Sequence, residues 1–186
     1  MSTQIFLNSQ GVGSNGIFTQ TANSTPVGGS VGNTSGNLIG TGVGSLTVPA
    51  NGFQVGDSFR LAMGGHLDSV NNKVLVISGI EATSTAVLFT TGNITMPNCT
   101  DEHWNLEVIF TIRAIGAAGV ASIASSGYFI YTKDASFSFE GENFSAINNT
   151  TFDTTLSTVL SIKATWNDGT VGNSIYSETG VLTKIY

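Results

Sequence analysis

Alternation between apolar and polar side chains is the feature that most constrains what this sequence can fold into. It is clearest in residues 104–112, where every second position is large and apolar and Ile109 alone interrupts the polar row between them. A repeat of two residues is the side-chain period of a β-strand. No segment of helical length keeps apolar residues three or four positions apart. The sequence therefore predicts an all-β protein.

Strand-length apolar segments recur from residue 45 onwards, about every 10–15 residues, with turn signals between them. A second face is expected from five residues in phase: Leu156, Leu160, Ile162, Ala164 and Trp166. Gly64-Gly65 is interpreted as a turn, and residues 117–124, the best helical candidate, as strand or loop because they contain Gly119 and two β-branched residues. About eight antiparallel strands predict a β-sandwich, and we expect a single jelly roll. The paired cysteines typical of an immunoglobulin sandwich are absent.

The first 56 residues carry no charged side chain, and residues 1–44 are rich in glycine. Glycine and serine alone would indicate a flexible linker. Short β-prone patches interrupt them, however, at residues 5–7, 17–18 and 38–39, and such patches are suited to joining another sheet. We therefore predict an extended N-terminal arm, residues 1–44, followed by a jelly-roll domain, residues 45–186. Either a neighbour or the chain's own body must cover the patches, because exposed they would favour aggregation.

Low charge excludes several classes of protein. The chain has 12 acidic and 6 basic residues, a net charge of -6, and 10% charged residues against about 25% in an average domain. Six cations cannot form the basic face of a nucleic-acid binder. No apolar stretch approaches a membrane span, no signal peptide is recognisable, and one cysteine allows no intrachain disulfide. A surface of short uncharged side chains suits permanent interfaces, so we expect a homo-oligomer.

No residue pattern argues for catalysis. Asp101, Glu102 and His103 are metal-ligand types, but adjacent strand residues point to opposite faces, and in a loop they would meet water. His66 has no serine or cysteine nucleophile motif to complete a triad. Cys99 is interpreted as an ordinary thiol in a polar loop. Residues 11–16 match GxGxxG but lack the helix and the acidic residue of a dinucleotide site. We therefore expect no enzyme and no catalytic, cofactor or metal residues.

Four aromatic residues could stack on sugar rings if their side chains are exposed. Trp104 and Trp166 are in phase with apolar faces, which favours packing in the core, whereas Tyr176 and Tyr186 stay open. Seven Asn-x-Ser/Thr sequons occur, and chance explains most of them in a chain this rich in these residues: Asn23, Asn33, Asn93, Asn98, Asn143, Asn148 and Asn149.

Several segments between residues 45 and 186 resemble jelly-roll modules in structural proteins of large DNA viruses and tailed phages. The segments are residues 46–61 with Gly64-Gly65, residues 104–112, 115–119, 151–155, 173–177 and 182–186. Some members of this group are similar to the trimeric TNF/C1q type, and others form the pentameric vertex of icosahedral capsids.

The resemblance implies a non-enzymatic virion protein, at a capsid vertex (penton) or as a minor capsid protein. It would form a pentamer or trimer and contact the major capsid protein or other virion proteins through the arm. The alternative is a trimeric receptor-binding fibre or tail-tip module whose loops bind host glycans. Neither implies catalytic residues, a nucleic-acid partner or a membrane span.

Overall fold

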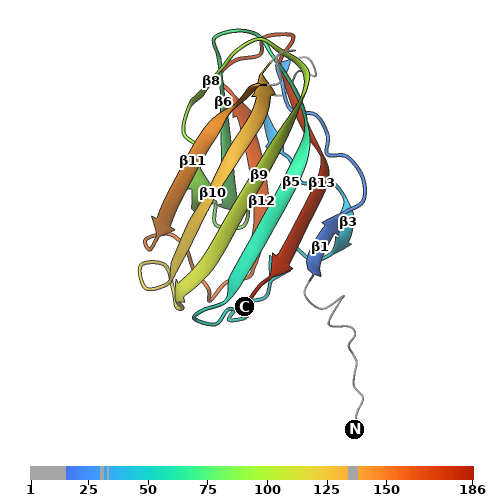
Figure 1. Ribbon diagram of the computed structural model, residues 1–186. Helices are drawn as coiled ribbons and strands as arrows, with labels where there is room; N and C mark the ends of the chain where they lie inside the picture. Colours follow the sequence, from blue (N-terminus) through green and yellow to red (C-terminus); the bar gives the residue numbers. More distant parts are fainter. Residues whose placement is uncertain (1–15, 30–31, 33, 134–137) are drawn as a thin grey trace.

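Two antiparallel β-sheets, packed face to face, form the fold (Figure 1). The computed structural model describes residues 16–29, 32, 34–133 and 138–186. Strands account for most of this part of the chain, and no helix is found in it. The predicted all-β antiparallel sandwich is confirmed.

The first sheet has seven strands in the order β11-β10-β9-β5-β13-β1-β3. Its long central members are β5, β9, β10 and β13, and β11 and β3 form its two edges. Their bounds are β1 Gly16–Gln20, β3 Gly42–Gly44, β5 Ser58–Ser69, β9 Cys99–Ala114, β10 Ser122–Lys133, β11 Ser138–Asn148 and β13 Ser174–Lys184.

The second sheet has six strands built around the pair β12 and β6. Strands β2 and β4 pair with β12 along its outer side, and β7 and β8 pair with β6. Their bounds are β2 Ser35–Asn37, β4 Thr47–Val48, β6 Lys73–Glu81, β7 Val87–Thr90, β8 Ile94–Met96 and β12 Thr158–Trp166. This smaller sheet lies behind the seven-stranded one in Figure 1.

Alternation along the strands places the core between the sheets, as the sequence predicts. Every second residue is buried along β5 and, from Trp104 to Ile112, along β9, and their neighbours face outward. The largest fully buried side chains include Trp104, Phe129, Phe89 and Phe152. Trp104 also donates hydrogen bonds from Nε1 to the carbonyls of His66 and Tyr176, both at 3.1 Å, which ties β9 to β5 and β13.

The strand order shares two features with a jelly roll and departs from it in a third. Strand β5 pairs with the last strand, β13, and β6 pairs with the second-last, β12. In contrast, β9, β10 and β11 form a three-strand meander within one sheet, where a jelly roll of two Greek keys would divide consecutive strands between the sheets. The sandwich is therefore established, and the jelly-roll topology is not.

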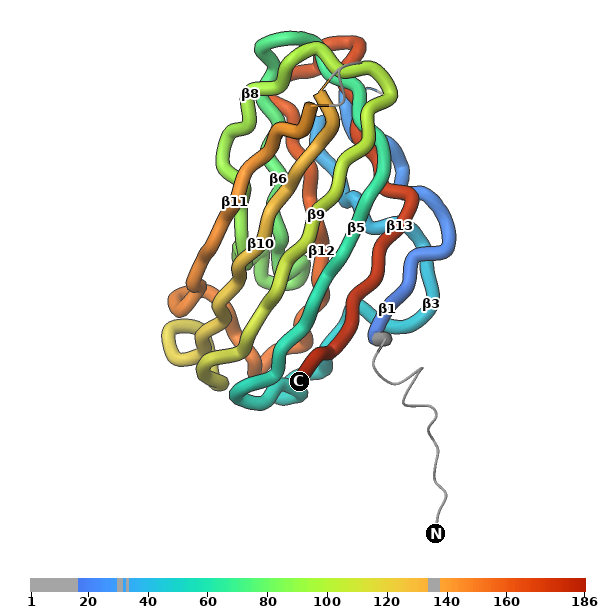
Figure 2. The backbone as a smooth tube through the Cα atoms, viewed as in Figure 1, coloured from blue at the N-terminus to red at the C-terminus, as the bar shows by residue number. Residues whose placement is uncertain are grey.

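The described residues between 16 and 44 lie against the rest of the same chain, in contrast to the extended arm that we predicted (Figure 2). Strand β1 continues the first sheet beside β13, and β2 joins the second beside β12. Phe18, Val27 and Leu38 are buried in the common core. Residues 1–15 lie outside the described residues.

A buried network around Ser177 explains this docking. Strand β13 has a bulge between Ser177 and Thr179 where it pairs with β5. Gln20 donates from Nε2 to Ser177 Oγ at 2.9 Å, and Ser177 and Ser24 exchange hydrogen bonds, each 2.9 Å long. Ser177 Oγ also donates to the Leu38 carbonyl. The N-terminal segment thus supplies the partners that buried polar groups at a bulge require.

Three local predictions were wrong. Gly64-Gly65 is not a turn but the middle of β5, where the Tyr176 carbonyl approaches so closely that a Cβ on Gly65 would lie 2.1 Å from it. Leu156 precedes β12 and is exposed, although Ile162, Ala164 and Trp166 share a buried face as expected. Strand β11 was not predicted at all.

Glu81, at the end of β6, is a buried carboxylate with three backbone donors. Oε1 accepts from the N–H groups of Thr83 at 2.8 Å and Val159 at 3.0 Å, and Oε2 accepts from Ser84 N–H. Burial alone would raise its pKa, but the hydrogen bonds from Ser84, Val159 and Thr83 lower the pKa to about 2. The ionised side chain therefore fastens the β6–β7 turn to β12.

We expect Glu81 to make folding sensitive to acid. Because its folded pKa lies below its unfolded pKa, its contribution is complete above pH 4.5 and is lost as the pH falls towards 2, at about 3 kcal/mol in all. Glu81→Gln should lower the free energy of unfolding at pH 7 by about 1–3 kcal/mol and flatten its fall below pH 4.5. Urea denaturation at several pH values measures both effects, with the exposed Glu142→Gln as control. An unchanged acid profile in the Glu81 variant would contradict the assignment.

Truncation distinguishes an arm from a structural segment. Deleting residues 1–44 removes Phe18, Val27 and Leu38 from the core, and each loss of such a side chain costs about 2–5 kcal/mol. We expect residues 45–186 alone to lose cooperative thermal unfolding, whereas residues 16–186 keep it. Circular dichroism melting of both fragments measures this. A fragment 45–186 that melts like the full chain would restore the predicted independent arm.

Candidate assembly surface

The outward face of the seven-stranded sheet, here called the outer face, is broad and carries few charges. On β9, β10 and β11 it is formed by short polar residues and exposed apolar ones. A shallow hollow crosses these three strands, with Ile109, Ala124 and Ile147 among its lining residues. The larger apolar side chains of this face are Ile109, Tyr128, Ile130, Phe139 and Ile147. Apolar side chains gathered on one exposed face are typical of a protein interface.

Two opposite charges of the outer face neutralise each other, whereas a further cation, Arg113, lines the hollow. Arg60 on β5 and Glu107 on β9 form an ion pair at 2.5 Å, and the hydrogen bond from Arg60 lowers the pKa of Glu107. An exposed pair of this kind contributes little to stability. It does keep this part of the face free of net charge.

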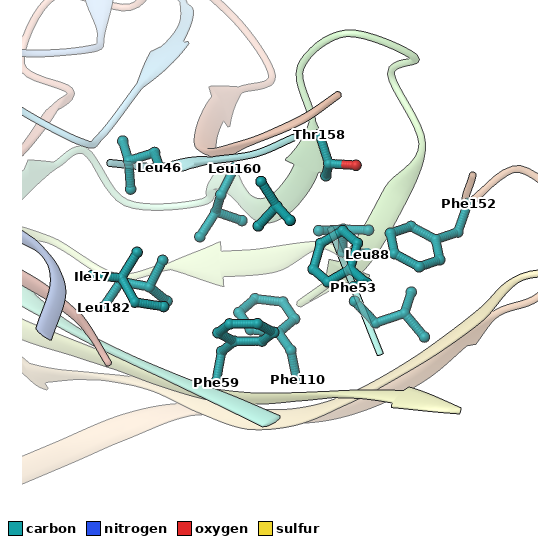
Figure 3. Close-up of a pocket in the computed structure, with 12 residues that line it drawn as sticks. Ile17, Leu46, Phe53, Phe59, Leu88, Phe110, Phe152, Thr158, Leu160 and Leu182 are labelled. Carbon is teal, nitrogen blue, oxygen red and sulfur yellow. The ribbon is translucent and has the colours of Figure 1, made fainter. Parts of the chain in front are cut away.

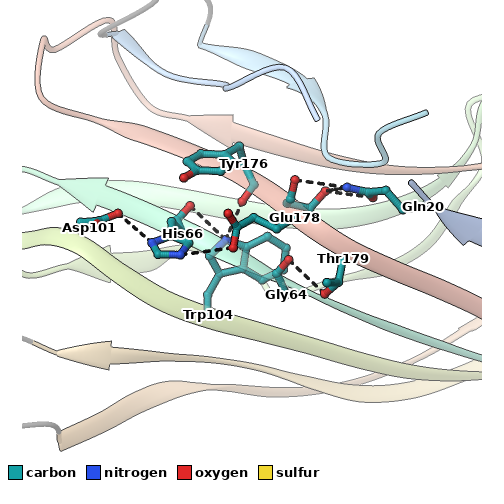
Figure 4. A network of polar contacts seen from close by, with 9 residues as sticks. Gln20, Gly64, His66, Asp101, Trp104, Tyr176, Glu178 and Thr179 are labelled. Atoms are coloured by element: carbon teal, nitrogen blue, oxygen red, sulfur yellow. Dashed lines mark hydrogen bonds and ion pairs between the residues drawn. The ribbon is translucent and has the colours of Figure 1, made fainter. Parts of the chain in front are cut away.

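His66 is the centre of a polar cluster further along the same face (Figure 4). Its Nδ1 lies 2.7 Å from Asp101 Oδ1, and its Nε2 lies 3.3 Å from Glu178 Oε2. The imidazole stacks on Tyr176, with ring centroids 5.8 Å apart. Burial, followed by the carboxylates of Glu178 and Asp101, raises the pKa of Tyr176. Four strand positions from β5, β9 and β13 thus meet here.

Asp101 and His103, two of the three adjacent residues of metal-ligand type in the sequence, belong to this cluster, and Glu102 does not. His103 lies beside His66, with ring centroids 4.3 Å apart, and Asp101 bonds to His66, whereas Glu102 is the neighbour of Leu67 across the strand pair. Over the residues that the structure describes, no three His, Cys, Asp or Glu side chains are grouped to hold a metal ion. Both His66 nitrogens face carboxylates, so neither is directed at a hydroxyl or thiol nucleophile. This geometry fixes the orientation of the His66 imidazole.

Other sequence candidates occupy structural positions. Cys99 was expected in a polar loop, but it begins β9 and is buried, with Sγ 3.9 Å from the Thr132 carbonyl. Residues 11–15 of the GxGxxG match lie outside the described residues, and the strand β1 follows them. Among the sequons, Asn33 also lies outside them. Asn148 is a structural residue, because its side chain bonds to the Val87 carbonyl and to three backbone N–H groups.

The aromatic residues divide as their phase predicts. Trp104 and Trp166 are 1% and 2% exposed, which confirms packing in the core over sugar stacking. Tyr176 is half-buried against His66, and Tyr186 is 81% exposed at the end of the chain. No helix of the described residues is both long and apolar enough to cross a membrane.

An apolar cavity of about 50 Å³ lies between the two sheets (Figure 3). Its walls are aromatic and aliphatic, with contributions from Phe53, Phe59 and Phe110. Thr158 also lines it, and the buried Thr158 Oγ1 has no hydrogen-bond partner. A bound water needs two to four polar partners, so one hydroxyl does not make a water site. We interpret the cavity as imperfect core packing.

Comparison of this chain with protein-family models, with curated proteins and with solved structures finds no match. The functional argument therefore rests on the surfaces described above.

We expect Thr158→Val to stabilise the protein. Valine keeps the shape of threonine and removes the unpartnered hydroxyl, so the free energy of unfolding should rise by about 1 kcal/mol. Thr154→Val is the matched control, because Thr154 Oγ1 accepts from Gly116 N–H at 2.8 Å and its loss should cost about 1–3 kcal/mol. Denaturant unfolding measures both. A Thr158 variant as destabilised as the control would show that its hydroxyl has a partner.

Proposed function

We propose that this chain is a non-enzymatic structural protein of a virus particle, a jelly-roll-related sandwich that assembles into a symmetric oligomer. A capsid vertex or a minor capsid position is the place that we favour. The observation that carries the proposal is the outer face, on which apolar residues lie among short polar ones and Arg60 is neutralised by Glu107. Burying the β9–β11 part of this face removes apolar surface from water and leaves few charges unpaired, Arg113 among them.

Two further observations support an assembling role over an enzymatic one. The polar cluster at His66 holds its imidazole between two carboxylates and leaves no free nitrogen for proton transfer. The cavity between the sheets is small and almost wholly apolar. Both observations support a role in assembly.

Oligomer mass tests the proposal. Native mass spectrometry and sedimentation velocity of the purified full chain should give a closed oligomer. Five copies would support the vertex, and three copies would support the alternative, a receptor-binding fibre or tail-tip module, which a glycan array would then examine. A monomer at micromolar concentration would contradict both.

One substitution connects the oligomer to the outer face. Ile109 is 41% exposed in the middle of this face, between β5 and β10. Ile109→Lys should convert the oligomer to smaller species, because it buries an unpaired charge, while the free energy of unfolding changes by no more than about 0.5 kcal/mol. Val171→Lys, in the exposed β12–β13 loop, is the control and should leave the mass unchanged. An Ile109 variant with the wild-type mass would exclude the outer face as the interface.

A further inference from the structure

Strand β11 presents a long unpaired edge. It pairs with β10 at all eleven positions from Ser138 to Asn148, and among the described residues no strand pairs with its other side. It forms the left-hand border of the front sheet in Figure 1. An edge of this length is a template for another strand.

The two halves of β11 differ in what lies beneath them. Phe144 stacks on Phe89 of β7 with ring centroids 4.5 Å apart, and Asn148 donates to the Val87 carbonyl at 2.8 Å, so the second sheet supports the C-terminal half. The N-terminal half, Ser138 to Glu142, is exposed throughout. The second sheet does not cover the side chains of this half, which we call the uncovered half.

This asymmetry is self-complementary. When two β11 strands run antiparallel, the supported half of each copy lies opposite the uncovered half of the other. A two-fold contact of this kind brings identical surfaces together.

Full overlap fixes the register. The midpoint of Ser138–Asn148 is Asn143, which then faces Asn143 of the second copy across the two-fold axis. In this register Phe139 faces Ile147 of the second copy, on the outer side of the sheet. These are the two most exposed large apolar side chains of the strand, at 73% and 58%. Opposed apolar side chains are the units that stabilise a strand pair.

Charge agrees with the same register. Glu140 faces Ala146 of the second copy, and Glu142 faces Phe144, so no two carboxylates oppose each other. A shift that placed Gly141 on the two-fold axis would put Glu140 opposite Glu142 on both sides of that axis. Like charges directly opposite destabilise a strand pair, so this shift is disfavoured.

We propose that two copies of this chain associate by antiparallel pairing of their β11 edges about a two-fold axis at Asn143. The two first sheets then continue into one sheet across both copies. This goes beyond the proposed function, because a pentamer or trimer joins two different patches, whereas this contact joins two identical ones. A single strand edge about 37 Å long buries less than the roughly 1,600 Å² of a standard interface, so the pair is weak in isolation.

Disulfide trapping tests the register. Opposed residues in antiparallel strands have Cα atoms about 4.5–5.5 Å apart, within reach of a disulfide. Asn143→Cys should therefore give a covalent dimer on mild oxidation of the full chain. Ser145→Cys is the matched control: it lies on the same exposed face, but its counterpart would be offset by four residues, about 13 Å away. Cys99 is buried and does not compete.

A charge exchange tests the apolar contact. The two-fold contact contains two equivalent Phe139–Ile147 pairs, and a single substitution disrupts both. In the Asn143→Cys background, Phe139→Lys or Ile147→Glu alone should therefore slow trapping by about tenfold. The double variant places Lys opposite Glu and should restore trapping to within about threefold. The two positions lie about 27 Å apart within one copy, so rescue must come from contact between copies.

The outcomes separate this inference from the proposed function. Efficient trapping of the Asn143 variant, with slow trapping of the Ser145 control and rescue by the double variant, supports the pair. Equal trapping at both positions, or no trapping at Asn143, overturns it. A chain that forms pentamers or trimers and shows no trapping would refute this contact while leaving the structural role intact.

Discussion

Every strand must satisfy its backbone N–H and C=O groups on both sides, and this fold meets that requirement differently at the two ends of its larger sheet. At one end, β1 and the edge strand β3 extend the sheet beyond β13, and the buried hydrogen bonds around Ser177 hold β1 beside β13. The bulge in β13 produces buried polar groups, and Gln20 and Ser24 satisfy them. The N-terminal segment is thus a structural part of the sandwich. At the other end, the long strand β11 is itself the edge.

Much of the core could be predicted from the sequence because its periodicity is strong. The alternation of residues 104–112 becomes the buried face of β9, and the phase of Trp166 gives its burial. The errors came where a local signal had two meanings. Gly64-Gly65 indicates a turn in isolation, but here Gly65 lets the Tyr176 carbonyl approach within a strand. Glycine-rich residues 16–44 resemble a linker, yet Phe18, Val27 and Leu38 among them lie in the core.

The surface features were harder to predict, since they depend on register across strands. Asp101 and His103 are neighbours in sequence, but only the pairing of β5 with β9 and β13 brings His66 and Glu178 to them. Strand β11 carries Gly141, two glutamates and two asparagines, which obscure its period of two. Its pairing with β10 at all eleven positions compensates for this weak local preference.

The composition of β11 is itself informative about how its edge is controlled. A long apolar edge would aggregate without limit, whereas charges and glycine restrict the registers in which it pairs. Glu140 already accepts a hydrogen bond from Tyr131 at 2.7 Å and forms an ion pair with Lys133 at 3.3 Å, so burial beside a second strand would not leave its charge unpaired. Glu142 has no such ion pair among the described residues, and its charge is tolerated only where the opposing side chain is neutral. The apolar residues Phe139 and Ile147 therefore favour association of this edge, and the two carboxylates restrict the registers in which it can pair.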